Sequence, residues 1–213
     1  MIPDWATERR RMVEAQLRRR GIRDRRLLDA MNEIPREEFV PPESRVGAYL
    51  DGPIHIGHGQ TISQPYMTAL MAEVLQLTGN ETVLEVGAGC GYAAAVLGNL
   101  AARVVAVELI PQLAQMAREN LRRTGRDGNI TVIDGDGWFG HPPLAPYRAI
   151  SVAAAAPEIP VALLEQLDDP GCLVIPVDIS EDQELRVVRK RGARIDYEVA
   201  TFCRFVPLRG GGQ

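Results

Sequence analysis

The chain contains 213 residues, of which 46% are hydrophobic and 24% are charged, proportions typical of a soluble globular protein. Its formal net charge of −4 argues against a general affinity for polyanions, and no apolar run approaches the ~20 residues that span a bilayer. The three cysteines are scattered, which argues against a disulfide framework and favours a reducing compartment, the cytoplasm.

The N-terminal part of the chain predicts helices followed by a lid. Residues 7–33 have the apolar spacing of one or two amphipathic helices with a break near Gly21. The many arginines between positions 9 and 26 fit the solvated faces of these helices, so we predict no nucleic-acid surface there. Residues 34–57 are rich in proline, and we expect an extended segment that serves as a lid or binding loop.

A helix is predicted from Pro65 to Leu75. Its apolar residues recur at helical spacing, and a proline suits the first helical turn. Ser63 and Gln64 stand where a capping residue belongs. Ser63 therefore has one interpretation that is purely structural, as the N-cap of this helix.

The lid segment carries a group of side chains that could suggest a metal site. Asp51, His55 and His58 are potential ligands, but their spacing is not helical and no cysteine pair lies near them. We therefore predict exposed imidazoles and no metal.

From residue 82 onward, strands alternate with helices. Strands are expected at residues 82–86, 103–108, 130–134, 148–153 and 172–177, and helices at 92–100, 111–124 and 159–167. Strands that are apolar on both faces and separated by helices predict a doubly wound, mostly parallel sheet, a Rossmann-like α/β fold. An antiparallel hairpin around residues 191–193 and a disordered tail at residues 210–212 are expected at the C-terminus.

These elements predict one domain over residues 1–213. Residues 1–58 would form an N-terminal helical cap and lid, residues 59–178 a cofactor-binding core, and residues 179–213 a C-terminal hairpin and tail. We expect a monomer that binds neither a membrane nor nucleic acid.

The sequence VLEVGAGCGY at residues 83–92 predicts a nucleotide-type cofactor site. It has the pattern of a strand, a glycine turn and the start of a helix. Gly87 and Gly89 allow a tight turn and close approach of the backbone to a ligand, and Gly91 allows the helix to pack closely on the strand. Glu108 ends the next strand, where a carboxylate can accept both hydroxyls of a ribose.

Two further acidic residues indicate which cofactor is bound. Glu85 lies two residues before the glycine turn, where a carboxylate would repel a pyrophosphate but suit the sulfonium and ammonium groups of S-adenosylmethionine. Asp136 follows the third strand and can accept a hydrogen bond from the adenine amine, although Asp136 and Gly137 could also merely form a turn. We therefore predict a class I methyltransferase fold with S-adenosylmethionine as cofactor.

Five motifs give the chain its resemblance to the protein-L-isoaspartate O-methyltransferase family. They are GQTISQPYM (59–67), VLEVGAGCGY (83–92), GDGW (135–138), AAAPEIPVALLEQL (154–167) and RFVPL (204–208). The resemblance covers the chain from about Met12 to Leu208. It implies methylation of the free α-carboxyl group of isoaspartyl residues, which arise in proteins when Asn deamidates or Asp isomerises.

The resemblance also assigns roles to individual residues. The serine of the family's TIS sequence is its active-site residue, and it corresponds to Ser63. The implied cofactor contacts are Gln60, Thr61, Ile62, Ser63, Glu108, Asp136 and Gly137. Cys90 replaces a frequent Ser or Thr between two glycines, but its backbone contacts to the cofactor should survive. Asp178 stands where a glycine is frequent, which leaves the peptide preference open.

Two other functions remain open from the sequence. One is a methyltransferase that acts on nucleic acid or a small molecule, which the arginine-rich N-terminus would favour. The other is a binding module that has lost catalysis, although the intact Ser63 and glycine turn argue against such degeneration.

Overall fold

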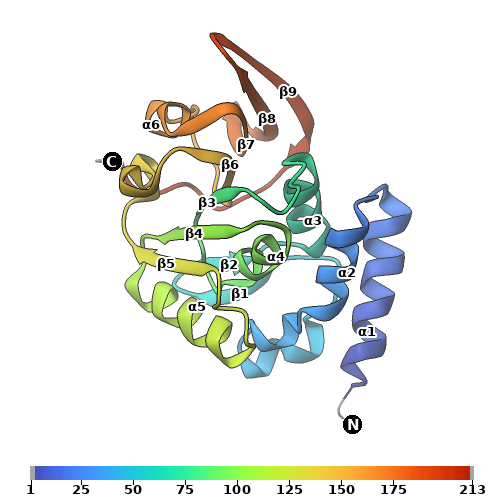
Figure 1. Ribbon diagram of the computed structural model, residues 1–213. Coiled ribbons are helices and arrows are strands. Elements are labelled where there is room, and N and C mark those ends of the chain that lie inside the picture. The colour runs from blue at the N-terminus through green and yellow to red at the C-terminus, as the bar shows by residue number, and fades with distance from the viewer. Residues whose placement is uncertain (1–2, 212–213) are drawn as a thin grey trace.

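The computed structural model of the protein describes residues 3–211 and shows a central sheet covered on both faces (Figure 1). The seven strands of this sheet are arranged in the order β5-β4-β3-β6-β7-β8-β9. Neighbouring strands are parallel from β5 to β7 and antiparallel from β7 to β9. The predicted doubly wound, mostly parallel α/β fold is therefore confirmed.

The sheet strands are β3 (Thr82–Val86), β4 (Arg103–Glu108), β5 (Ile130–Asp134), β6 (Tyr147–Val152), β7 (Leu167–Ile179), β8 (Asp182–Arg191) and β9 (Arg194–Cys203). The α-helices are α1 (Trp5–Met12), α2 (Arg25–Glu33), α3 (Pro65–Val74), α4 (Tyr92–Leu100), α5 (Pro111–Arg123) and α6 (Val161–Glu165). A separate two-stranded antiparallel ribbon joins β1 (Ile54–Gly57) to β2 (Gln60–Ile62).

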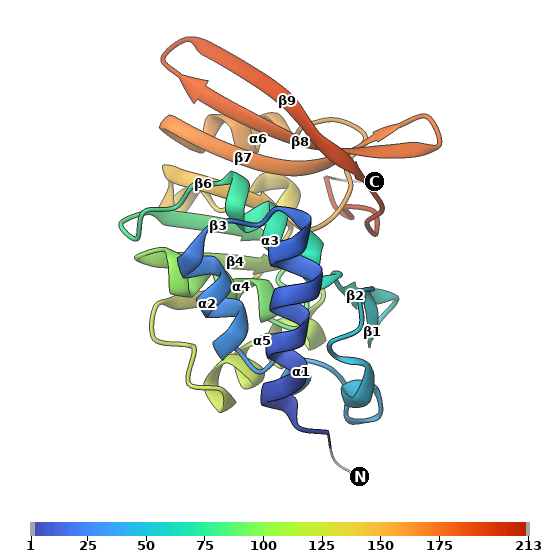
Figure 2. The ribbon, with the colours of Figure 1, turned by 90° about the vertical axis from the view of Figure 1, so that its right-hand side faces the viewer.

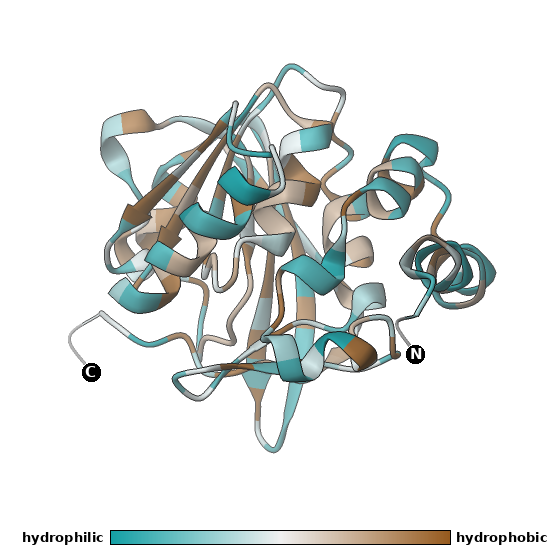
Figure 3. Ribbon diagram, turned by 90° about the horizontal axis from the view of Figure 1, so that it is seen from below, coloured by the Kyte–Doolittle hydropathy of each residue, from teal (hydrophilic) through white to brown (hydrophobic). Residues whose placement is uncertain are grey.

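The two faces of the sheet pack against different layers. Val83 of β3 belongs to the cluster that includes α1 to α5, whereas Leu84 and Val86 belong to the cluster that includes α6. Because both faces of β3 are covered, its apolar residues point to both sides of the sheet. Figure 3 shows the apolar strands, in brown, between helices that carry hydrophilic residues.

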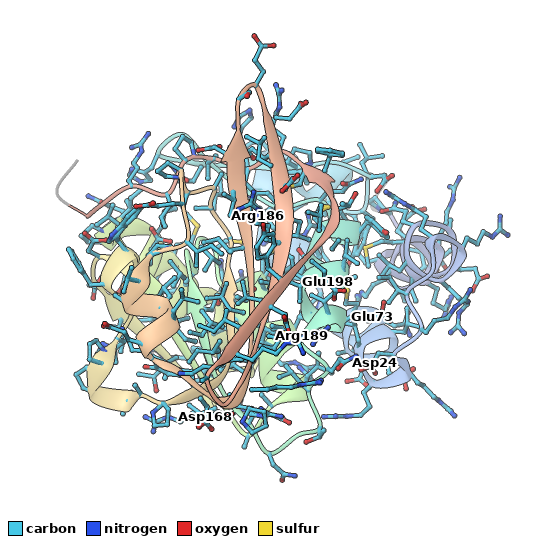
Figure 4. The ribbon with its side chains drawn as sticks, turned by 90° about the horizontal axis from the view of Figure 1, so that it is seen from above. Asp24, Glu73, Asp168, Arg186, Arg189 and Glu198 are labelled. Carbon is cyan, nitrogen blue, oxygen red and sulfur yellow. The ribbon has the colours of Figure 1, made fainter. Side chains whose placement is uncertain are left out.

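The N-terminal helices end where the sequence predicted a break. The α1 helix continues through a π-helical turn (Val13–Leu17) and a 3-10 turn (Arg18–Arg20) to Gly21, whose φ of 102° favours glycine. The α2 helix then packs beside α1 (Figure 2). The carboxylate of Glu73 on α3 accepts the N–H of Asp24 at 2.8 Å and so ties the start of α2 to the core (Figure 4).

The lid segment is more structured than predicted. The prediction of an extended chain over residues 34–57 is wrong at two 3-10 turns (Arg36–Glu38 and Pro42–Gly47), whereas strand β1 at the end of the segment is extended as predicted. A proline stands before the first turn and two prolines stand at the start of the second, where a fixed φ favours a helical turn over an extended chain.

The C-terminal strands form a meander and not only the predicted hairpin. The β7 strand extends to Ile179, and its residues 171–179 pair antiparallel with β8. The predicted turn around Gly192 does connect β8 to β9, and Gly192 has a φ of 60°. The antiparallel strands make one end of the molecule (Figures 1 and 2).

The glycine tail is held in place where disorder was expected. The N–H of Gly211 donates to a carboxylate oxygen of Asp136 at 2.8 Å. A Cβ on Gly210 would lie 2.0 Å from the other oxygen of that carboxylate, so only glycine fits there. The prediction is therefore wrong for residues 210 and 211, and residue 212 lies outside the described residues.

Within residues 3–211, no helix has the length and apolar character needed to cross a membrane.

Candidate active site

A cavity opens at the carboxyl ends of β3, β4 and β6. Ligands of doubly wound sheets bind in the crevice at this edge. The predicted site residues that line it are Gln60, Thr61, Ile62, Ser63, Gly87, Gly89, Cys90, Glu108 and Gly137. Glu85 and Asp136, the other two predicted residues, are adjacent in sequence to lining residues but do not line the cavity themselves.

The glycine turn has the conformation that its sequence requires. Gly87 and Gly91 both have a φ of 87°, in the region that favours glycine. The N–H of Gly87 donates to the carbonyl of Val107 at 2.8 Å, which anchors the turn to the neighbouring strand. Gly91 then begins α4, and a Cβ there would lie 3.2 Å from the backbone of Ala117 on α5.

Glu108 is fixed by two main-chain donors. Its Oε2 accepts the N–H of Gly89 at 2.8 Å, and its Oε1 accepts the N–H of Ile110 at 3.0 Å. An ionised carboxylate can accept about four hydrogen bonds, so two acceptor positions remain for a ligand. Glu108 lines the cavity with its orientation already set.

Glu85 is a buried carboxyl group without a partner. Its side chain is 1% exposed, and neither carboxylate oxygen has a hydrogen-bond partner among the described residues. Burial, reinforced by the nearby charge of Glu108, raises the pKa of Glu85 well above its ordinary value. Such a group fits a positively charged ligand, because a cation would supply the missing interaction.

Ser63 lies between β2 and α3 and lines the cavity. Its interpretation as the helix N-cap is wrong. Helix α3 begins at Pro65, the capping position is Gln64, and no side chain caps the helix. The Ser63 side chain is therefore not committed to the helix end.

Asp136 has local partners at the end of β5. Its Oδ1 accepts the N–H of Trp138 at 2.9 Å, and its Oδ2 accepts the N–H of Gly211. These bonds agree with the alternative in which Asp136 shapes a turn, and they leave acceptor capacity on both oxygens. The neighbouring Gly137 lines the cavity, and a Cβ there would lie 2.4 Å from a methyl group of Val86.

The C-terminal segment completes the cavity wall, which the sequence analysis did not predict. The N–H of Ala155 donates to Val206 at 2.8 Å, and the N–H of Leu208 donates to Ala155 at 2.7 Å. Residues 206–209 consequently line the cavity. The RFVPL motif covers part of this segment and was the available signal.

The two histidines of the lid are exposed. His55 and His58 are exposed on and beside β1, as their position in the lid predicted. Among residues 3–211, no group of three His, Cys, Asp or Glu side chains is placed to hold a metal ion.

A doubly wound sheet with a glycine turn, a fixed acidic residue on the next strand and an unpaired buried carboxyl defines a class I, S-adenosylmethionine-dependent methyltransferase. The family model of protein-L-isoaspartate(D-aspartate) O-methyltransferase matches residues 7–213. The chain belongs to this family, and its reaction is the S-adenosylmethionine-dependent methylation of isoaspartyl residues in proteins.

Individual relatives support this assignment. The chain is 51% identical to protein-L-isoaspartate O-methyltransferase of Methanoregula boonei, over 95% of this chain and 93% of that protein. It is 53% identical to protein-L-isoaspartate O-methyltransferase 2 of an Anaeromyxobacter species, over 97% of this chain and 85% of that protein. It is also similar to the solved structure described as the Plasmodium falciparum enzyme in complex with S-adenosyl-L-homocysteine. That structure has a TM-score of 0.82 and 26% identity, and the match covers 94% of this chain and 98% of that one.

Proposed function

We propose that Ser63 orients the α-carboxylate of an isoaspartyl residue for attack on the methyl group of S-adenosylmethionine. The observation that carries this role is the position of Ser63, on the wall of the cavity formed by the glycine turn and Glu108, with no role at the helix end. A neutral hydroxyl can donate to one carboxylate oxygen without neutralising the nucleophile.

The nucleophile in this reaction needs no general base. A free α-carboxyl has an ordinary pKa of about 3.3–3.7 and is ionised at neutral pH. Burial raises the pKa of the Cys90 thiol to about 11 and that of the Tyr92 hydroxyl to about 12, so neither group is an anion at neutral pH. The site instead contributes by removing water from the carboxylate and holding it in line with the methyl group.

The chain's own residues fit the parts of the cofactor. The two free acceptor positions of Glu108 would accept hydrogen bonds from the ribose hydroxyls. Glu85 would lie next to a positive charge of the methionine portion. Asp136 would accept a hydrogen bond from the adenine amine. Backbone groups of the Gln60–Ser63 segment, Cys90 and the glycines would supply the remaining contacts. When bound, S-adenosylmethionine supplies an activated methyl group.

The cellular location and the oligomeric state of the protein are also part of this proposal. The cysteines at positions 90, 172 and 203 are free thiols, which supports a cytoplasmic location. We propose that the chain acts as a monomer and as one methyltransferase domain, because the core and the C-terminal segment both contribute lining residues to one cavity, and Arg36 of the lid is hydrogen-bonded to Ser63 in its wall.

Methyl transfer to matched peptides tests this function. The isoaspartyl peptide should be methylated far faster than its aspartyl twin, whose carboxylate is displaced by one methylene. Misplacement by about 1 Å can cost on the order of 100-fold in rate. Equal rates for the two peptides would indicate a general carboxyl methyltransferase. Transfer to RNA, included as a third substrate, would indicate a nucleic-acid enzyme.

A further inference from the structure

Arg36 is a fully buried arginine that contacts the main chain of the active-site serine. It lies in the 3-10 turn Arg36–Glu38, far from Ser63 in sequence, and its side chain is 0% exposed. Its Nη2 donates to the carbonyl of Ser63 at 2.7 Å, and its Nε donates to the carbonyl of Ala48 at 2.8 Å. Arg36 thus joins the lid to the segment that carries the catalytic hydroxyl.

Within residues 3–211 the charge of Arg36 has no counter-charge. No carboxylate of the described residues lies within ion-pair distance of the guanidinium, and its Nη1 has no hydrogen-bond partner. Burial lowers the pKa of Arg36, but a guanidinium remains protonated at neutral pH. A buried charge without a counter-charge is costly, and two carbonyl dipoles and the face of the Tyr92 ring offset that cost only in part. Fixing the lid alone therefore does not explain an arginine at this position.

The guanidinium of Arg36 lies next to residues that form the cavity wall. It lies 4.9 Å from the centre of the Tyr92 ring, and the Tyr92 hydroxyl is also buried without a partner. Tyr92 and Ser63 both line the cavity. Arg36 consequently stands behind two neighbouring parts of the cavity wall and does not itself reach the cavity surface.

We propose that Arg36 is a positioning residue for the methyl-accepting carboxylate. Its Nη2 fixes the Ser63 carbonyl and hence the stretch of main chain from which the Ser63 side chain extends. Its charge supplies positive potential for the incoming anion from behind the wall. This inference rests on the proposed role of Ser63.

Placing the charge behind the wall reconciles two requirements of the reaction. The substrate carboxylate must be attracted into a cavity that also contains the carboxylate of Glu108. A cation in direct contact with the nucleophilic oxygen would stabilise the ground state and slow its attack. A charge that is separated from the substrate by the Ser63 peptide attracts the anion without forming that contact.

A different arginine, Arg209, does line the cavity and provides an alternative source of positive charge. Arg209 is exposed and belongs to the C-terminal segment, next to Gly210, which packs against Asp136. Variants of Arg36 and Arg209 therefore have to be compared in the same assay.

The test uses the full-length enzyme, an isoaspartyl peptide and S-adenosylmethionine. Arg36→Gln removes both the charge and the planar guanidinium whose Nε and Nη2 bind two carbonyls. Arg36→Lys keeps the charge but loses this pair of donors, the fork. The matched control is Arg26→Gln, because Arg26 also donates to main-chain carbonyls, those of Leu77 and Leu100, and does not line the cavity. Affinity for S-adenosylhomocysteine, measured by calorimetry, reports whether the cofactor site is intact in each variant.

The two Arg36 variants should separate the two contributions. Arg36→Gln should raise KM for the peptide and lower kcat, each by roughly 10- to 100-fold, with affinity for S-adenosylhomocysteine within about twofold of the wild type. Arg36→Lys should restore most of KM but not kcat. Arg26→Gln should leave both constants within about twofold of the wild type, and any increase in KM for Arg209→Gln should be smaller than the increase for Arg36→Gln.

Several results would overturn the role of Arg36. Arg36→Gln could have the same kcat and KM as Arg26→Gln. Arg36→Lys could have a KM as high as that of Arg36→Gln. KM could also increase in Arg209→Gln alone. If Arg36→Gln does not fold, Arg36→Lys alone decides, because an unchanged kcat contradicts positioning by the fork. Ser63→Ala is measured in parallel. Full activity of Ser63→Ala would refute the proposed function, whereas a slow Ser63→Ala enzyme with unaffected Arg36 variants refutes only this inference.

Discussion

The carboxylate of Glu108 accepts a hydrogen bond from the N–H of Gly89, with 2.8 Å between Oε2 and the nitrogen. The last residue of β4 is thereby tied to the glycine turn that follows β3. The same carboxylate binds the N–H of Ile110, at the start of α5. Glu108 therefore both holds the glycine turn and presents acceptor positions to the cavity, and these two contributions can be separated by substitution.

Glu108→Ala should weaken binding of S-adenosylhomocysteine. The ribose hydroxyls would lose a charged acceptor worth about 1.5–3 kcal/mol for each hydrogen bond, and the turn would lose its tether. Glu108→Gln should bind better than Glu108→Ala, because its amide oxygen can still accept the N–H of Gly89. Calorimetry checks both values, with the exposed Glu119→Ala on α5 as the control. Unchanged affinity in Glu108→Ala would remove Glu108 from the site.

Glu85→Gln should change how stability depends on pH. The raised pKa of Glu85 means that the ligand-free folded protein retains a proton that the unfolded chain releases near the ordinary value of 4.5. Because the folded state binds more protons above that value, this group makes the free energy of unfolding fall as pH rises toward the raised pKa. A neutral glutamine removes this decline. Urea unfolding from pH 5 upward should show the variant gaining stability relative to the wild type.

Cofactor binding should release the proton of Glu85. A positive charge next to this carboxyl favours its ionised form, so binding of S-adenosylhomocysteine should be accompanied by proton release in the wild type. Calorimetry in two buffers with different ionisation enthalpies measures the number of protons released. Glu85→Gln should release fewer. Equal proton release by the two proteins would place the ammonium group elsewhere.

Gly91→Ala should destabilise the fold more than a glycine substitution at an open position. Both Gly91 and Gly125 have positive φ, 87° and 66°, which costs an alanine about 1–2 kcal/mol. A Cβ at Gly91 also meets Ala117 of α5 at 3.2 Å, whereas a Cβ at Gly125 meets no atom within 4 Å. Gly91→Ala should therefore lose a further 1–3 kcal/mol, roughly, through overpacking. Urea midpoints compare the two variants, and equal losses would contradict close packing of α4 on α5.

The parallel half of the sheet could be predicted because each of its strands carries a local signal. The apolar runs that became β3 and β4 are bounded by turn residues, and the positions of Gly87 and Glu108 follow from them. The antiparallel pairing of β7 with β8 could not be predicted, because the apolar run at residues 172–177 does not show in which direction the neighbouring strand runs. The sequence of a strand contains only a weak signal of which other strand it pairs with.

The site shows the same division between local and distant signals. The cavity-lining residues of the glycine turn were predicted from one continuous motif. Arg36 was not, because its importance depends on a contact with Ser63, 27 positions further along the chain. In sequence it is one of many arginines, and only the fold shows that its charge is buried. Ser63 was proposed through family resemblance, and only the structure shows that Gln64, and not Ser63, occupies the cap position.

Ser63→Ala should lower kcat and leave the affinity for S-adenosylhomocysteine nearly intact. If the hydroxyl orients the substrate carboxylate, the loss of one hydrogen bond costs roughly 1–3 kcal/mol, or about 5- to 150-fold in rate. Ser63→Thr keeps the hydroxyl but adds a methyl group at the cavity wall, so it should retain part of the activity. Because Ser63 is not a covalent nucleophile in this proposal, transfer from a chirally labelled methyl group should proceed with a single inversion. Net retention would require two displacements and a methylated enzyme, and it would contradict a purely orienting serine.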